Sequence, residues 1–211
     1  LAALVTWTTF AISLGLLVEV AVNGTISYAI GDWAPPWGIE YRVDLFSAFI
    51  LVIVSGIGSL VMPFARESIE REIPRERIYL LYVMYLLCLT GLLGIAITGD
   101  AFNLFVFLEI SSLSSYVLIS LGSDRRALTA AFRYLIMGTI GATFYVLGVG
   151  MLYMMTGTLN MADLAERVPD LIHLRTVETA LAFLIVGISL KLALFPLHLW
   201  LPNAYAFAPT M

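Results

Sequence analysis

The chain has 211 residues, of which 61% are hydrophobic and only 12% are charged, and its formal net charge is −4. A soluble domain carries about 25% charged residues, so a water-soluble globular fold is excluded. The 11 basic residues are scattered among 15 acidic ones, and nucleic acid is therefore not expected as a partner. The single cysteine, Cys88, excludes an internal disulfide and a cysteine-based metal site. This composition is typical of a multi-pass membrane protein.

Six apolar segments meet or approach the length of about 20 residues that a membrane-spanning helix needs. They are Leu1–Val22, Leu45–Phe64, Ile78–Thr98, Ala101–Leu121, Leu128–Met155 and Val177–Phe195. Turn-forming Gly, Pro and Asp lie between them. Asp100 is placed to cap the fourth helix, and Asp124 to cap the fifth. We therefore predict an all-α bundle of about six transmembrane helices in a single domain, residues 1–211.

The arginines in the loops predict the orientation of the bundle. Most of them fall in the second and fourth loops, at Arg66, Arg71, Arg75, Arg77, Arg125 and Arg126. Because Lys and Arg accumulate on the cytoplasmic side of membrane proteins, we expect these two loops to be cytoplasmic in a prokaryotic plasma membrane. Residues 66–72 mix acidic and basic side chains, and we interpret them as a solvated surface turn.

Glycine recurs in the fifth segment, in the pairs Gly138/Gly141 and Gly148/Gly150. No strand precedes these residues, so a phosphate-binding loop is untenable. Small residues allow membrane helices to approach closely, and we expect the fifth helix to have such a neighbour.

Glu109 is an isolated carboxyl within the fourth segment. Counted from Ala101 it lies roughly 12 Å along the helix, near the middle of a hydrocarbon core of about 30 Å. Ser112, Tyr116 and Ser120 follow on the same helix face. A charge at that depth costs about 2.5–3.5 kcal/mol and commonly marks an ion or proton pathway. The alternative is a structural carboxyl that is hydrogen-bonded within the bundle.

Lys191 is the only lysine in the chain and lies in the sixth segment. We expect that helix to be broken at Phe195-Pro196, because proline removes an N–H and clashes with the preceding turn. A broken helix beside a buried ammonium is typical of transporter ion sites. Burial favours neutral lysine while a nearby carboxylate favours the charged form, so Glu109 and Lys191 together predict a proton-transfer pair. The alternative is a lysine that reaches the membrane interface.

His198 is a possible third member of the path. It follows Lys191 by seven residues and would share its helix face if the helix resumed after the break, and its near-neutral titration suits a relay. A buried, fully hydrogen-bonded histidine is an equally good interpretation. Arg133 would either neutralise a carboxylate or reach the interface. We interpret the tryptophans as interfacial anchors or packing residues; they are Trp7, Trp33, Trp37 and Trp200. No metal site or cofactor is predicted, because too few ligand residues are present.

Three strings resemble the antiporter-like membrane subunits. Residues 98–109, TGDAFNLFVFLE, together with Ser114-Ser115-Tyr116, resemble the fifth helix of that family. Residues 191–202, KLALFPLHLWLP, resemble its broken seventh helix, and residues 156–164 fit the loop before that helix. The family includes the D-type membrane protein of Mrp-type cation/proton antiporters and proton-pumping subunits of respiratory complex I and membrane-bound hydrogenases. The resemblance covers nearly the whole chain.

The resemblance implies a fold of about fourteen helices built from two inverted five-helix repeats, of which this chain would supply the second to the seventh helix. The chain would then be a fragment of a longer protein. In that scheme Glu109 and Lys191 are the glutamate–lysine pair of the first half-channel. Asn203 stands where many members have aspartate, so a role for that carboxylate has no counterpart here.

Our first hypothesis is a proton-translocating subunit of a multisubunit antiporter that exchanges protons for Na⁺ or K⁺ beside other membrane subunits. The alternative is the same proton path inside complex I or a membrane-bound hydrogenase, where the whole assembly is an enzyme such as NADH:quinone oxidoreductase. A third hypothesis is a non-conducting subunit that serves only as a scaffold in assembly.

Overall fold

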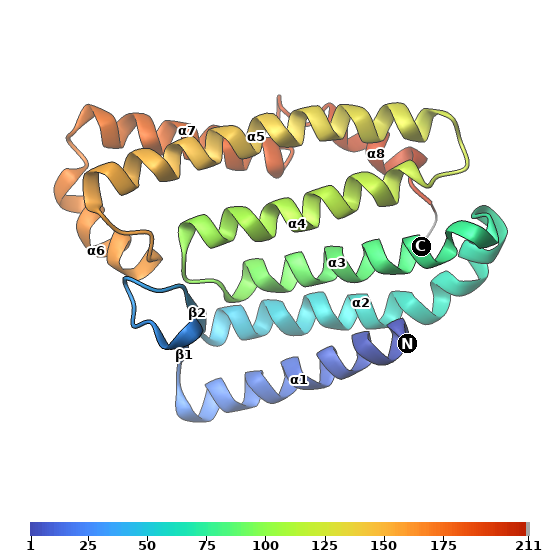
Figure 1. The fold of residues 1–211 in the computed structure, drawn as a ribbon, viewed down its shortest axis with the longest axis horizontal. Coiled ribbons are helices and arrows are strands. Elements are labelled where there is room, and N and C mark those ends of the chain that lie inside the picture. Colours follow the sequence, from blue (N-terminus) through green and yellow to red (C-terminus); the bar gives the residue numbers. More distant parts are fainter. Residues whose placement is uncertain (210–211) are drawn as a thin grey trace.

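Long helices run back and forth between two ends of the molecule in the computed structural model, which describes residues 1–209 (Figure 1). Five are long and apolar enough to cross a membrane: α1 (Ala2–Asn23), α2 (Leu45–Glu72), α3 (Ile78–Ile97), α4 (Ala101–Ser120) and α5 (Arg126–Thr156). The shorter elements are β1 (Ile26–Ala29), η1 (Ile30–Asp32), β2 (Glu40–Val43), η2 (Arg75–Arg77), α6 (Met161–Leu171), α7 (Arg175–Lys191) and α8 (Trp200–Phe207). The predicted all-α membrane fold is confirmed.

The helix of the sixth predicted span, Val177–Phe195, ends early, and a second short helix follows after a break. The helix α7 has 17 residues and ends at Lys191, and α8 begins at Trp200. Turns occupy residues 192–199 between them. Figure 1 shows α7 entering from one end of the bundle and α8 lying at the other. The predicted break is therefore present, and it begins four residues before Phe195.

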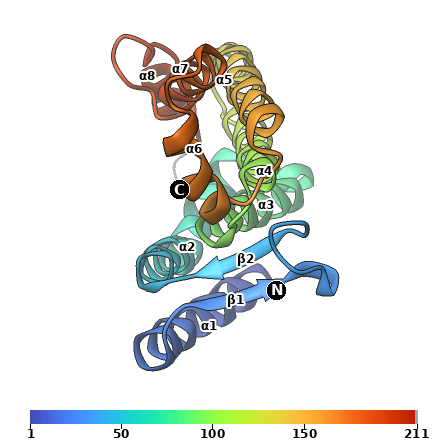
Figure 2. The same cartoon turned by 90° about the vertical axis from the view of Figure 1, so that its left-hand side faces the viewer.

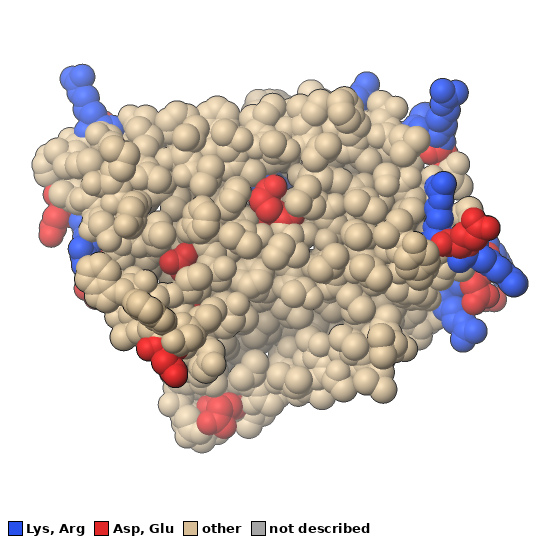
Figure 3. All heavy atoms as spheres, viewed as in Figure 1, with Lys and Arg blue, Asp and Glu red and all other residues tan. Residues whose placement is uncertain are grey.

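The two ends of the bundle differ in charge and in structure. One end, which we call the basic end, carries the α2–α3 and α4–α5 connections with the six arginines named above (Figure 3). The other end, which we call the hairpin end, carries β1, β2, α6 and the α3–α4 connection. Both loops predicted to be cytoplasmic thus lie at the same end. The cytoplasmic assignment itself stays a prediction.

A short β-hairpin that the sequence did not predict fills the first loop. The strands β1 and β2 pair antiparallel, with Ile26 opposite Val43. Figure 2 shows the hairpin lying across the ends of the first helices. Val43 is buried together with Val20 of α1 and Leu51 of α2. Because a two-stranded hairpin is marginal by itself, this contact with the helices holds it in place.

Glu40 links the hairpin to a distant part of the chain. Its buried carboxylate accepts a hydrogen bond from the Ser27 hydroxyl and another, of 2.8 Å, from the Asn160 amide. The Asn160 side chain also caps α6 by accepting from the N–H groups of Ala162 and Asp163. One carboxylate therefore joins the first loop to the α5–α6 connection.

The interpretation of residues 66–72 as a surface turn is wrong, because they form the last two turns of α2. Their charges form i,i+4 ion pairs, which stabilise a helix: Arg66 with Glu70 at 3.2 Å and Arg71 with Glu67 at 3.5 Å. Ile69 on the same segment is only 1% exposed. The helix continues because its final turns combine these pairs with a buried apolar side chain.

The fifth predicted loop also contains a helix, α6. Besides the Asn160 cap, Arg167 holds this helix to the end of α5. Its guanidinium donates to Asp163 at 2.7 Å and to the Thr156 carbonyl at 2.9 Å. Leu164, Val168 and Leu171 of α6 pack against α5 and α7. With Met161, which packs against Tyr145 and Val149, the apolar face of α6 has four residues, and so short a pattern did not predict this helix.

The close neighbour expected for the fifth helix is α7. A Cβ atom on Gly187 would lie 2.7 Å from the Gly141 carbonyl oxygen and 2.7 Å from the Tyr145 nitrogen. A Cβ on Gly148 would lie 2.8 Å from the Ala180 carbonyl oxygen, whereas one on Gly150 would meet nothing within 4 Å. The glycine prediction therefore holds at Gly141 and Gly148 but not at Gly150. This contact fixes the position of α7, and with it Lys191 one turn further on.

Replacing Gly187 by Ala is expected to destabilise the protein by about 1–3 kcal/mol, because the new methyl group overpacks two backbones that cannot move apart cheaply. Thermal unfolding of the full-length chain in detergent measures this loss. Gly150→Ala is the matched control, and it should be neutral or slightly stabilising. Equal melting temperatures for the two variants would contradict the close α5–α7 contact.

Asp100 caps α4 as predicted, and its Oδ1 accepts from the Asn103 N–H at 2.7 Å. Asp124 caps α5 less directly than predicted. The N-cap residue of α5 is Arg125, and Asp124 accepts from the Arg126 N–H at 2.8 Å. Asp100 is only 6% exposed, and this burial raises the pKa of its carboxyl against the lowering effect of the N–H bonds. The ionised form at neutral pH is thus disfavoured by folding.

Asp100→Asn is expected to leave stability unchanged or to raise it at neutral pH, since asparagine caps equally well without a buried charge. Asp100→Ala removes the cap and should cost about 1 kcal/mol. Because the folded-state pKa is raised, the wild-type chain should gain stability as the pH falls through that pKa, and Asp100→Asn should lose this gain. Unfolding midpoints measured between neutral and acid pH test both statements, and a destabilised Asp100→Asn variant would refute them.

Candidate functional site

Lys191 and Glu109 form an ion pair between α7 and α4. The Lys191 Nζ atom lies 2.7 Å from Glu109 Oε1 and 2.8 Å from the Ser112 hydroxyl oxygen. The lysine side chain is 9% exposed and the glutamate side chain 23%. The structure therefore brings together both residues of the predicted pair, and Ser112 is a third member of the site. A lysine that reaches the membrane interface does not fit this geometry.

Lys191 occupies the last residue of α7. The carbonyl groups at the end of a helix carry partial negative charge, which favours a cation there. Directly after it, Ala193 adopts a left-handed backbone with φ of 52°, a conformation that is strained for a residue with a Cβ atom. The helix thus stops at the residue that carries the charge.

Trp200 covers the broken end of α7. Its indole N–H donates to the Leu190 carbonyl at 3.1 Å, which satisfies a group freed by the break. The Trp200 ring is 6% exposed and stacks on Tyr134 of α5 at a centroid distance of 3.9 Å. Of the two interpretations given for Trp200, packing is correct. Its hydrogen bond was missed, because sequence spacing does not show which carbonyl an indole reaches across a turn.

Only part of the polar stripe predicted on α4 contacts the ion pair. Ser112 contacts Lys191, whereas Ser120 donates to the Val117 carbonyl of its own helix at 2.7 Å. Tyr116 is 6% exposed, and among residues 1–209 its hydroxyl has no hydrogen-bond partner. The stripe therefore continues from the ion pair toward the basic end through Tyr116.

His198 does not share a helix face with Lys191, because the helix does not resume until Trp200. Its ring packs against Phe195 at a centroid distance of 5.5 Å. Its Nδ1 atom is buried and makes no hydrogen bond within the part of the chain that the structure describes. A relay role for His198 stays a prediction. Arg133 is exposed on α5.

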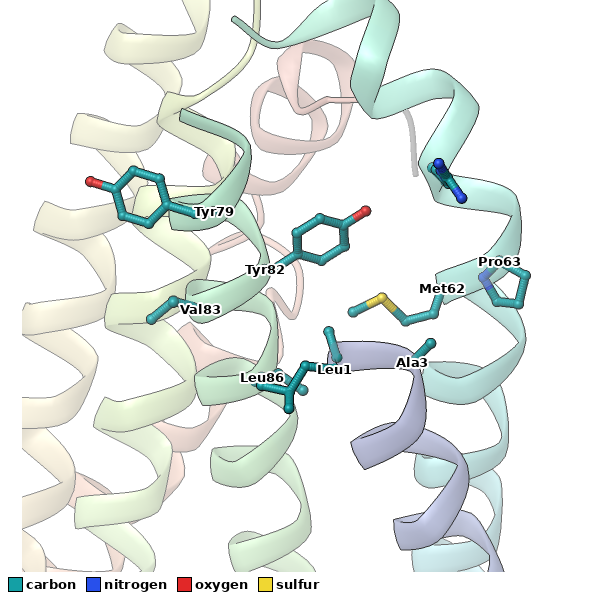
Figure 4. A pocket seen from close by; sticks show the side chains of 10 residues that line it. Leu1, Ala3, Met62, Pro63, Tyr79, Tyr82, Val83 and Leu86 are labelled. Atoms are coloured by element: carbon teal, nitrogen blue, oxygen red, sulfur yellow. The ribbon is translucent and has the colours of Figure 1, made fainter. Parts of the chain in front are cut away.

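Of two cavities among the helices, the smaller one reaches the ion pair and the larger one does not. A cavity of about 180 Å³ lies beside Lys191 and is lined by Ile95, Leu104, Phe105, Leu108, Ala142, Tyr145, Gly187, Ile188, Lys191 and Leu192. A larger cavity, about 720 Å³, is an open groove between the start of α1, α2 and α3 (Figure 4). Figure 4 shows Tyr82 pointing across this groove toward Met62 and Pro63. None of the ion-pair residues lines it, so it lies apart from the candidate chemistry.

The arrangement offers groups suited to proton chemistry. Within the described residues, no group of three or more His, Cys, Asp or Glu side chains lies close enough together to hold a metal ion. The site instead combines one amine, one carboxyl and one hydroxyl at hydrogen-bond distance. Such a set is able to hold and release a proton.

The ion pair is expected to contribute far more to the free energy of unfolding than an ion pair on the surface does. Glu109→Gln should destabilise the full-length protein by about 3–5 kcal/mol, because it leaves the Lys191 ammonium without a countercharge. Glu109→Gln combined with Lys191→Met should recover much of this loss, giving a large coupling energy in a double-mutant cycle. Thermal unfolding in detergent measures the cycle. Additive effects of the two substitutions would show that the groups do not interact.

Several known proteins are similar to this chain in sequence. The family described as NADH:quinone oxidoreductase/Mrp antiporter, transmembrane, matches residues 98–211, which is more than half of the chain. The N subunit of the NADH-quinone oxidoreductase of Desulforudis audaxviator is 48% identical over 194 residues, covering 92% of this chain and 38% of that protein. The D subunit of the Na⁺/H⁺ antiporter of Alkalihalophilus pseudofirmus is 37% identical over 198 residues, covering 94% and 39%. The chain thus spans about two fifths of these relatives.

Two solved structures have the same fold. A chain of the membrane-bound sulfane sulfur reductase, an archaeal respiratory membrane complex, superposes with a TM-score of 0.92 at 35% identity, over 99% of this chain and 42% of that chain. A chain of the Mrp complex from Dietzia sp. superposes with a TM-score of 0.84 at 26% identity, over 98% and 38%. This chain is a multi-pass membrane segment and belongs to the NADH:quinone oxidoreductase/Mrp antiporter transmembrane family.

Proposed function

We propose that this chain is the first proton-translocating unit of a membrane subunit in a multisubunit monovalent cation/proton antiporter. The observation that carries the proposal is the 2.7 Å contact between Lys191 Nζ and Glu109 Oε1 at a helix break. The relative from a Na⁺/H⁺ antiporter and the fold shared with a chain of an Mrp complex support it. In this proposal residues 1–211 belong to one transmembrane domain, and other membrane subunits surround it.

The ion pair works as a switch. While Glu109 is ionised, its charge and the end of α7 both favour the ammonium form of Lys191. When Glu109 takes up a proton, or when the two groups separate, the apolar surroundings favour the neutral amine. Lys191 then passes its proton onward, and it takes up another when Glu109 is ionised again. The charge state of one residue therefore controls the proton on the other.

A second candidate is the same proton path inside a redox-driven complex. The relative at 48% identity is named as the N subunit of an NADH-quinone oxidoreductase, and the superposition with TM-score 0.92 is with a chain of a respiratory complex. In that case electron transfer in other subunits drives the pump, and the ion pair does the same work. Neighbouring genes distinguish the two. Genes for quinone- and flavin-site subunits favour the redox complex, whereas genes for small antiporter subunits favour the antiporter.

Lys191→Ala is expected to lower proton transport by about 100-fold or more, as loss of a proton-transferring group does in enzymes, while the complex still assembles. Proton flux in membrane vesicles that contain the full-length protein in its complex measures this, driven by a Na⁺ or K⁺ gradient or by an electron donor. Lys191→Arg should fail as well, although it keeps the charge, because a guanidinium does not release its proton.

The matched control is Arg66→Ala, which removes an equally long cation from an ion pair that is 78% exposed on the arginine side. It should leave transport unchanged. Normal transport by Lys191→Ala and by Glu109→Gln in an assembled complex would refute the proposal and leave the scaffold hypothesis.

A further inference from the structure

The hydroxyl of Tyr116 is buried without a structural partner. The residue is 6% exposed, and no other side chain or backbone group among residues 1–209 forms a hydrogen bond with that hydroxyl. Buried hydroxyl groups are normally paired, and an unpaired one lowers stability relative to a phenylalanine of the same shape. The fold itself therefore gives no reason for this oxygen atom, and its presence points to a function.

The surroundings of Tyr116 place the hydroxyl close to the ion pair. Tyr116 lies on the same face of α4 as Glu109 and Ser112. The oxygen fits against Gly138 of α5 so closely that a Cβ atom there would overlap it. Gly138 thus makes room for the hydroxyl, and a larger residue at 138 would displace it.

Tyr134 of α5 lies next to Tyr116. The two rings meet edge to face with a centroid distance of 4.5 Å. Tyr134 also lines a cavity of about 250 Å³ together with Ser115, Leu118, Ile119, Trp200, Ala204, Tyr205, Ala208 and Pro209. This cavity lies beside α8, whose Phe207 is in contact with Arg126 at the start of α5. Ser115, Tyr134 and Tyr205 therefore bring hydroxyl groups to a cavity on the α8 side of Tyr116.

The side of the ion pair that faces the hairpin end has few hydroxyl groups. Toward the hairpin end, the cavity beside Lys191 has only one hydroxyl in its lining, that of Tyr145, and this hydroxyl donates to the Ala101 carbonyl at 3.1 Å. Its remaining lining, apart from Lys191, is apolar. Apolar cavities of this size stay dry. A proton on Lys191 thus has polar neighbours on one side only.

We propose that Tyr116 is a proton relay that connects Lys191 and Ser112 with the basic end of the bundle, by way of Tyr134. This inference rests on the proposed function. In each transfer the Tyr116 oxygen accepts a proton from one neighbour while its own proton passes to the next, so the phenol is neutral before and after. Rotation of the hydroxyl then resets the relay. No oxidant, cofactor or metal takes part.

The test is Tyr116→Phe in the full-length protein within its complex, assayed for proton flux in membrane vesicles and for thermal stability in detergent. Flux is expected to fall by at least about tenfold, because a group that donates and accepts the proton is lost. Thermal stability should stay equal or rise, because the removed hydroxyl has no structural partner. A merely structural tyrosine would give the opposite result, with normal flux.

Tyr85→Phe is the matched control. The Tyr85 hydroxyl donates to the Gly58 carbonyl at 2.7 Å, so its loss should lower stability while leaving flux intact. If Tyr116→Phe transports normally while Lys191→Ala is inactive, the relay is refuted and the proposed function stands. If Lys191→Ala also transports normally, the proposed function fails. Should Tyr116→Phe not accumulate, Tyr134→Phe tests the same route, with a tenfold loss supporting it and normal flux overturning it.

Discussion

An ammonium group held away from water needs negative charge close by, and this requirement accounts for the architecture around Lys191. Placing a charge at the centre of a membrane costs about 2.5–3.5 kcal/mol on insertion scales. Three features offset that cost here: the carboxylate of Glu109, the hydroxyl of Ser112 and the end of α7. The first two come from α4, and the third exists because α7 stops at Lys191. Neither helix satisfies the charge alone.

The helix break is held in place by contacts that lie outside α7 itself. Trp200 bonds the freed Leu190 carbonyl and stacks on Tyr134 of α5. One turn before Lys191, Gly187 lets α7 approach the backbone of α5 at Gly141. The helix α5 thus positions both sides of the break. This explains how a strained residue such as Ala193, with φ of 52°, is retained next to the charge, since the surrounding contacts determine the backbone there.

The sequence predicted the spans, the break and the two charged residues, because each has a local signature: apolar length, a proline, and a charge where apolar residues surround it. The side chains that contact those features had no local signature in the sequence. The contact of Ser112 with Lys191, the bond of Trp200 to Leu190 and the packing of Tyr116 on Gly138 each join residues of different helices or opposite sides of a turn. The hairpin and α6 were missed for another reason. Their apolar patterns are too short, and contacts such as that of Glu40 with Asn160 stabilise them.

The site has polar neighbours toward the basic end and mostly apolar ones toward the hairpin end, and in the proposed mechanism Lys191 is therefore connected to the basic end. A proton that crosses must at some stage lose that connection and gain the other. The ammonium form is held by Glu109 and Ser112, whereas a neutral amine leaves them for apolar surroundings at a much smaller cost in free energy. Protonation of Glu109 therefore weakens the bond that keeps α7 against α4. In the proposed mechanism the Lys191 side chain then changes its partner, while the contacts of Gly187 and Trp200 keep the end of α7 in place. In the proposed mechanism the same ion pair that stabilises the fold thus also sets which side of the membrane the proton reaches.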